Sequence, residues 1–165
     1  MMKVSSRTHY GLRAMTELAK AYDRRTLSLT EIAAIEHLPL PYLEQVVGPL
    51  RRAGLVEGTR GVHGGYRLTR APDAISVGEV VRALEGADAT APVECVADSY
   101  VDGSCVREAE CLSRPLWSRV KAAMNLVLFG TSLGDLCRDG QMARDFLNLS
   151  PDLLAMKEQT VTSNG

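Results

Sequence analysis

Residues 40–68, LPYLEQVVGPLRRAGLVEGTRGVHGGYRL, decide the fold of this chain. Their first half repeats apolar side chains at helical spacing and predicts a helix that begins at Pro41, with a kink or a short terminal turn at Pro49. Its expected buried face is Leu43, Val46, Val47 and Leu50. Residues 55–57 and 66–68 then predict two strands around a glycine-rich tip. A helix that leads directly into such a hairpin is typical of a winged helix-turn-helix.

Two further helices are predicted before this stretch. Residues 7–22 are amphipathic at helical spacing, and Ser5 or Ser6 can cap their start. Ser28 and Glu31 fit a capping box that opens a second, short helix. Its expected buried residues are Ile32, Ala33 and Ile35. The expected fold class is therefore mainly α with a small β-hairpin wing.

The charge is divided unevenly along the chain. Residues 1–70 contain eleven basic and six acidic side chains, whereas residues 71–165 contain eight and fourteen. A basic N-terminal part favours a polyanionic partner, most simply nucleic acid. With a helix over 76–84, residues 1–85 form the expected DNA-binding domain, in which the third helix enters the major groove and Arg60 of the wing the minor groove.

Other classes of protein are disfavoured by what the sequence lacks. No apolar run approaches the roughly 20 residues of a membrane span, and the N-terminus lacks the apolar core of a signal peptide. We therefore expect a cytoplasmic protein, in which thiols stay mostly reduced. No glycine-rich phosphate loop, paired carboxylates or nucleophile elbow suggests an enzyme.

Three of the four cysteines lie in the run CVADSYVDGSCVREAEC, residues 95–111. The run is rich in Asp, Glu, Gly and Ser, so residues 86–112 are predicted to form an exposed loop. Thiols gathered on one loop favour a metal or cluster site, a disulfide or a redox switch. Zinc remains open, because three thiols and a histidine can bind it, and a small-molecule sensor with incidental cysteines remains open as well.

Residues 113–145 are predicted to hold a long helix and a short final one, with a disordered tail over 146–165. The expected apolar face of the long helix is Leu116, Val120, Ala123, Met124, Val127 and Leu128, with Trp117 beside it. A face this wide needs a partner, which is the same helix of a second subunit, the first helix of its own chain, or both.

With these motifs, the chain resembles the Rrf-type family of bacterial winged-helix transcription regulators, which includes IscR, NsrR and RirA. The resemblance covers roughly residues 2–140. It rests on SSRTHYGLRAM, on residues 40–68, on ISVGEVVRALEG and on the cysteine loop followed by CLSRPLWSRV. The family implies a homodimer with crossed long helices, bound to a palindromic operator of double-stranded DNA, most often as a repressor.

The resemblance also implies an iron–sulfur cluster, held by Cys95, Cys105 and Cys111 and controlling the affinity for the operator. Both two-iron and four-iron clusters are considered, with the two-iron type preferred. In IscR-like members a histidine three residues after the last cysteine is the fourth ligand; that position is Arg114 here, which cannot ligate. His9 of the partner subunit is then the first candidate and Cys137 the second, with solvent, a small thiol or an acidic side chain as further alternatives.

The same resemblance assigns DNA contacts. Its recognition-helix positions are Pro41, Tyr42, Glu44 and Gln45, and its wing position is Arg60. Glu44 can accept a hydrogen bond from a cytosine amino group, and Gln45 can pair with adenine. The expected phosphate contacts are Ser5, Arg7, Arg51 and Arg52.

Overall fold

The computed structural model describes residues 4–61 and 64–138, so the expected tail over 146–165 lies outside the described residues. The chain is mainly helical with one two-stranded hairpin, as the sequence predicted. The elements are α1 (Ser6–Lys20), α2 (Leu29–Glu36), α3 (Leu40–Arg52), β1 (Val56–Thr59), β2 (Gly65–Leu68), α4 (Val77–Glu85), α5 (Arg114–Gly130) and α6 (Leu133–Cys137). Short 3-10 turns η1 (Pro72–Ala74), η2 (Glu94–Val96) and η3 (Glu108–Glu110) lie between them.

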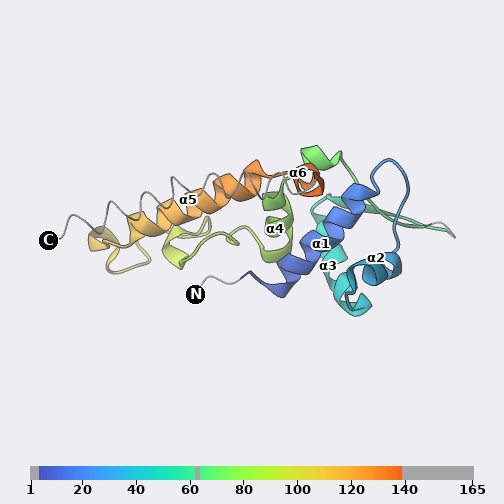
Figure 1. Cartoon of the computed structure of the whole chain (residues 1–165). Helices are drawn as coiled ribbons and strands as arrows, with labels where there is room; N and C mark the ends of the chain where they lie inside the picture. The colour runs from blue at the N-terminus through green and yellow to red at the C-terminus, as the bar shows by residue number, and fades with distance from the viewer. Residues whose placement is uncertain (1–3, 62–63, 139–165) are drawn as a thin grey trace.

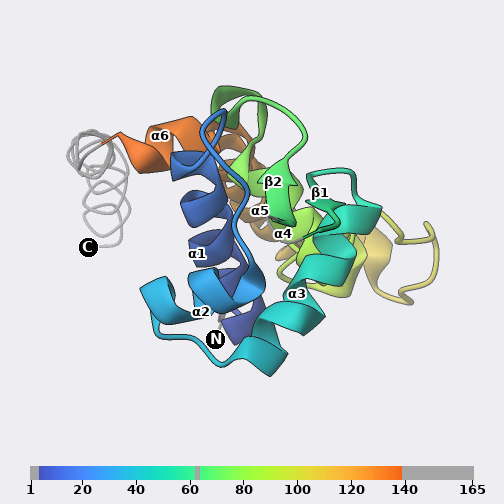
Figure 2. The ribbon, with the colours of Figure 1, turned by 90° about the vertical axis from the view of Figure 1, so that its right-hand side faces the viewer.

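A head made of α1–α4, the hairpin and α6 surrounds the hydrophobic core (Figures 1 and 2). Its most deeply buried side chains are Met15, Leu27, Ile32, Leu43, Leu50, Leu55, Ile75 and Leu133. The hairpin is antiparallel, with Val56 opposite Leu68, and Leu27 adds a backbone bridge to Tyr66. The wing is thereby fixed to the segment between α1 and α2.

The predicted caps are present. The Ser5 hydroxyl accepts a hydrogen bond from the N–H of Thr8 (3.0 Å) at the start of α1. Ser28 and Glu31 form the expected capping box at α2. These interactions satisfy amide groups that the first turn of a helix leaves without a partner, which is why the sequence could locate the helix starts.

Three local predictions were wrong. α1 ends at Lys20, and not at Tyr22. Ile35 is 48% exposed, because α2 is a short surface helix that buries only Ile32. α3 begins one residue before Pro41. The short terminal turn expected at Pro49 is present, because the helix continues past this buried proline for one last turn to Arg52.

The helix α5 extends away from the head and carries the cysteine loop at its far end (Figure 1). Its C-terminal part packs on α4, where the Phe129 ring lies against Gly78. The Arg82 guanidinium lies over this ring, with 5.0 Å between the guanidinium carbon and the ring centroid. The alternative that α5 packs mainly on α1 was wrong, since its main intrachain contacts are α4 and η2. No helix of the described ranges has the length and hydropathy to cross a membrane.

Candidate DNA interface and cysteine loop

The front of α3 and the start of α1 form one surface depression. Arg7 from α1 lines it together with Tyr42, Glu44, Gln45 and Arg52 from α3. The Glu44 and Gln45 side chains are exposed, as a base-reading residue requires. The structure therefore brings together residues that the sequence assigned to DNA from two separate helices.

Tyr42 is half-buried at this surface and is held by aromatic contacts. Its ring meets the Tyr10 ring edge-on, with 5.2 Å between centroids. The Arg13 guanidinium lies over the Tyr10 ring, 6.0 Å from its centroid, and forms an ion pair with Glu36 at 2.6 Å. These contacts link α1, α2 and α3 and fix the start of α3. The sequence assigned Tyr42 to the DNA contacts but did not predict its contact with Tyr10.

The arginines assigned to DNA have their charges available. Arg7, Arg51, Arg52 and Arg60 are exposed and form no ion pair with another described residue. By contrast, seven arginines are paired with carboxylates: Arg13, Arg25, Arg67, Arg70, Arg82, Arg114 and Arg138. Phosphate neutralisation needs cations that are not already committed within the protein.

The three loop cysteines are free thiols, Cys95 and Cys111 partly exposed and Cys105 exposed. In the described conformation they are not gathered: within residues 4–61 and 64–138, no three His, Cys, Asp or Glu side chains lie close enough together to hold a metal ion. Hydrogen bonds from the Ser113 hydroxyl and from the backbone N–H groups of Arg114 and Ser113 lower the pKa of the Cys111 thiol. The thiolate is the form that ligates metals.

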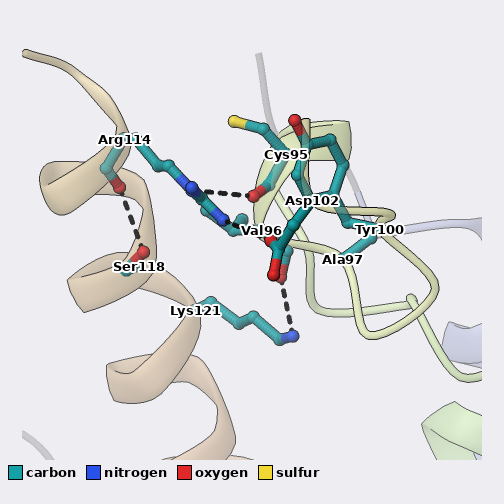
Figure 3. A pocket seen from close by; sticks show the side chains of 8 residues that line it. All are labelled: Cys95, Val96, Ala97, Tyr100, Asp102, Arg114, Ser118 and Lys121. Carbon is teal, nitrogen blue, oxygen red and sulfur yellow. Dashed lines mark hydrogen bonds and ion pairs between the residues drawn. The ribbon is translucent and has the colours of Figure 1, made fainter. Parts of the chain in front are cut away.

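Side chains from α5 hold the loop against the helix (Figure 3). Arg114 Nε donates to the carbonyl oxygen of Cys95 (3.2 Å), and Lys121 Nζ donates to that of Val96 (2.7 Å). Both cations line an open pocket with Cys95, Tyr100 and Asp102. The sequence treated Arg114 only as a missing ligand and did not identify Lys121. The acidic composition of the loop was the signal that could have indicated these two cations, since its carboxylates require positive charges nearby.

The two candidates for a fourth ligand lie in different places. The His9 side chain is exposed near the start of α1, and its ring lies 5.5 Å from that of Tyr10. Cys137 lies in α6, beyond the opposite end of α5 from the loop (Figure 1), and its thiol faces the Thr16 carbonyl at 3.7 Å. Burial is the main cause that raises the pKa of the Cys137 thiol. The position of Cys137 in its own chain is that of a core-packing residue.

A short helix pair, a hairpin wing and arginines that pair with no described residue, at the start of α1, at the end of α3 and in the wing, define a winged-helix DNA-binding protein. The sequence profile of the Rrf2 family, described as "Iron-dependent Transcriptional regulator", matches residues 4–139. The chain belongs to this family, whose members found here are named as transcription regulators and are not enzymes.

Two kinds of relative resemble the chain. The HTH-type transcriptional regulator CymR of Bacillus subtilis (strain 168) is 44% identical over 135 residues, which cover 82% of this chain and 89% of that protein. Its solved structure, titled as that of the global cysteine regulator, superposes with a TM-score of 0.66 over 83% of this chain and 97% of that one, at 42% identity. The structure of T. potens IscR gives 0.68 at 35% identity, covering 86% of this chain and 90% of that one. IscR of Aliivibrio salmonicida is 36% identical over 142 residues, covering 86% and 80%.

Proposed function

We propose that the chain acts as a cytoplasmic homodimeric repressor that binds a palindromic operator, and that the state of its cysteine loop controls the affinity for DNA. One observation carries this proposal: the loop is bonded to the N-terminal half of α5, while the DNA-binding head packs on the C-terminal half. A change in the loop therefore acts on the helix that sets the position of the head.

The surface of α5 supports a dimer. None of its 17 residues is buried, although a helix of this composition is not stable alone in water. Large apolar side chains remain exposed on it away from the α4 contact: Leu116 (53%), Leu126 (77%) and Val127 (41%). The same helix of a second copy would cover this face and place two α3 helices at a fixed separation. DNA half-sites have a fixed spacing, so a small movement between the heads changes the affinity.

The donor set of the loop suits an iron–sulfur cluster in kind, because three unoxidised thiols occur within residues 95–111 and the pKa of one of them is lowered. Cys95, Cys105 and Cys111 would be its ligands, with His9 of the partner subunit as the proposed fourth. Since the thiols are not gathered in the described conformation, the loop has to rearrange to hold such a group. A bound cluster supplies a link between the loop segments that oxidants and nitric oxide can destroy.

A second candidate function keeps the DNA interface but uses no cluster. Two observations favour it: the higher identity to CymR, and the separated thiols of the loop. In this version the loop senses through a thiol–disulfide change, zinc or a small molecule.

One series of measurements on anaerobically purified protein separates the two candidate functions. It comprises a visible absorption spectrum, iron and sulfide analysis, and operator titration with and without the cluster. Structured visible absorption with equal iron and sulfide, together with an affinity that changes when the cluster is removed, supports the first function. A colourless protein that binds the operator tightly supports the second.

A further inference from the structure

We propose that Arg114 is the positioning residue of the cysteine loop: in the metal-free protein its guanidinium holds all three cysteine-bearing segments together and ties them to the start of α5. The proposal deepens the regulation inferred above and, for its effect on DNA, rests on that proposed function. Arg114 thus does more than occupy the position at which IscR-like members carry a histidine ligand. It is the group that gives the loop a defined structure without metal.

The first contacts reach the segment around Cys95. Arg114 Nε donates to the Cys95 carbonyl at 3.2 Å, so the guanidinium fixes the backbone that carries this thiol. The same group lies over the Tyr100 ring, 5.3 Å from its centroid, and forms an ion pair with Asp102 at 3.5 Å. A planar guanidinium has five donors in a fixed fork and can stack on a ring face, so it suits a carbonyl, a ring and two carboxylates better than the three-donor ammonium of lysine.

The second set of contacts passes through Glu108. Its carboxylate pairs with Arg114 on one oxygen and accepts from the Tyr100 hydroxyl (3.1 Å) and the Gly103 N–H (2.6 Å) on the other. The hydrogen bond from the Gly103 N–H is the largest of several causes that lower the pKa of Glu108, so this carboxylate stays charged. The Tyr100 oxygen in turn accepts from the Cys105 N–H at 3.1 Å. Arg114 therefore reaches Cys105 through two intermediate side chains.

The third segment, which carries Cys111, lies close to Arg114 in the sequence. Glu108 lies in the turn η3, which ends directly before Cys111, and Arg114 is the first residue of α5. Lys121, two helical turns further on, adds a second attachment at Val96. The side chain of Lys121 is 15% exposed, and it also pairs with Asp98. The loop thus meets α5 along one face, with Arg114 at the end nearest the Cys95 thiol (Figure 3).

The consequence is competition between two arrangements of the loop. The described thiols do not form a group that could hold a metal ion, so the loop has to rearrange to bind one. The bonds made by Arg114 stabilise the arrangement without metal and therefore compete with that rearrangement. Removing the guanidinium should leave the metal-free loop mobile while the head stays folded, since the Arg114 side chain bonds, among residues 4–61 and 64–138, only to the loop.

The test uses the full chain, purified without metal and without DNA, in hydrogen exchange measured by mass spectrometry. In Arg114→Ala, the amides of Gly103 and Cys105 should exchange at least about ten-fold faster than in the wild type, while α1–α4 are unchanged. Arg114→Lys should recover part of the protection because it keeps the charge beside Glu108. Arg107→Ala is the matched control, since it removes an exposed arginine of the same loop whose side chain makes no hydrogen bond to a described residue.

Wild-type exchange rates at Gly103 and Cys105 in Arg114→Ala would overturn the proposal. If that variant fails to fold, Glu108→Gln breaks the relay from its other side and should accelerate the same two amides. A second measurement addresses the coupling to DNA, by fluorescence anisotropy with a duplex that the wild-type protein selects from a random pool. The metal-free Arg114→Ala protein should differ from the wild type at least about five-fold in affinity. An opened loop with unchanged affinity would refute the coupling. Neither measurement uses a cluster, so both remain valid if the iron–sulfur proposal fails.

Discussion

Leu126→Glu on α5 is the substitution that tests the proposed dimer most directly. Leu126 is the most exposed large apolar side chain within α5, at 77%, so a second copy that packs on the open side of this helix would cover it. Burying a leucine contributes about 1.5–3 kcal/mol, so covering the exposed part of Leu126 is worth about 1–2 kcal/mol in each subunit. A two-fold interface contains the residue twice, which gives about 2–4 kcal/mol for the dimer.

Each 1.4 kcal/mol corresponds to a factor of ten, so the dimer dissociation constant should rise at least about 30-fold. Two carboxylates brought into an apolar contact add a further penalty, which makes this a lower limit. Sedimentation velocity over a concentration series measures the constant directly. Ile35→Glu is the matched control, because Ile35 is 48% exposed on α2, on the other side of the head from the projecting α5 (Figure 1).

If Leu126→Glu dissociates no more readily than the wild type, the reasoning from the α5 face is refuted. The same holds if Ile35→Glu dissociates as readily as Leu126→Glu, since the effect would then come from added charge and not from the lost contact. A circular dichroism spectrum of each variant confirms that α5 has not unfolded.

Three further predictions concern the head and its stability. An ideal Cβ at Gly78 would lie 2.6 Å from the Phe129 ring, so Gly78→Ala should cost about 1–3 kcal/mol of unfolding free energy in urea denaturation, and no loss would argue against the α4–α5 contact. Arg51→Ala should weaken binding to all DNA sequences and lower the salt-dependence slope by about 1, whereas Gln45→Ala should relax specificity at one base pair; both effects are read by anisotropy, and the reverse pattern would exchange their assigned roles. The pKa of Glu31 is lowered from 4.5 to about 2, first by the N–H of its N-cap residue, so its stabilisation is present above pH 4.5 and is lost as the pH falls towards 2. Glu31→Gln should flatten that part of the curve of Tm against pH, and an unaltered curve would contradict the assignment.

Features that depend on neighbours in sequence were predicted well. The capping box of Ser28 and Glu31 and the hairpin around the glycine-rich tip follow from a few adjacent residues, and both are present. Ile35 was misplaced because helical spacing tells which residues share a face but not how much of a short helix the fold covers.

The α5 face and the cysteine loop mark the limit of prediction more clearly. The predicted stripe of α5 omitted Leu126 and included Val120, Met124 and Leu128, which the structure leaves only partly exposed. Apolar residues surround much of this helix, so periodicity alone could not separate the side that meets α4 from the side that remains open.

The sequence by itself determined the winged-helix class, the helix starts and the candidate DNA and thiol residues, because these follow from local hydrogen bonding, side-chain periodicity and residue chemistry. The tertiary structure alone decided that Arg7 lines the same depression as Gln45, that Cys137 and the loop lie beyond opposite ends of α5, and that Arg114 connects Cys95, Tyr100 and Glu108. Such contacts join residues far apart in the chain, and their distances depend on how complete elements pack against each other, which no local pattern encodes.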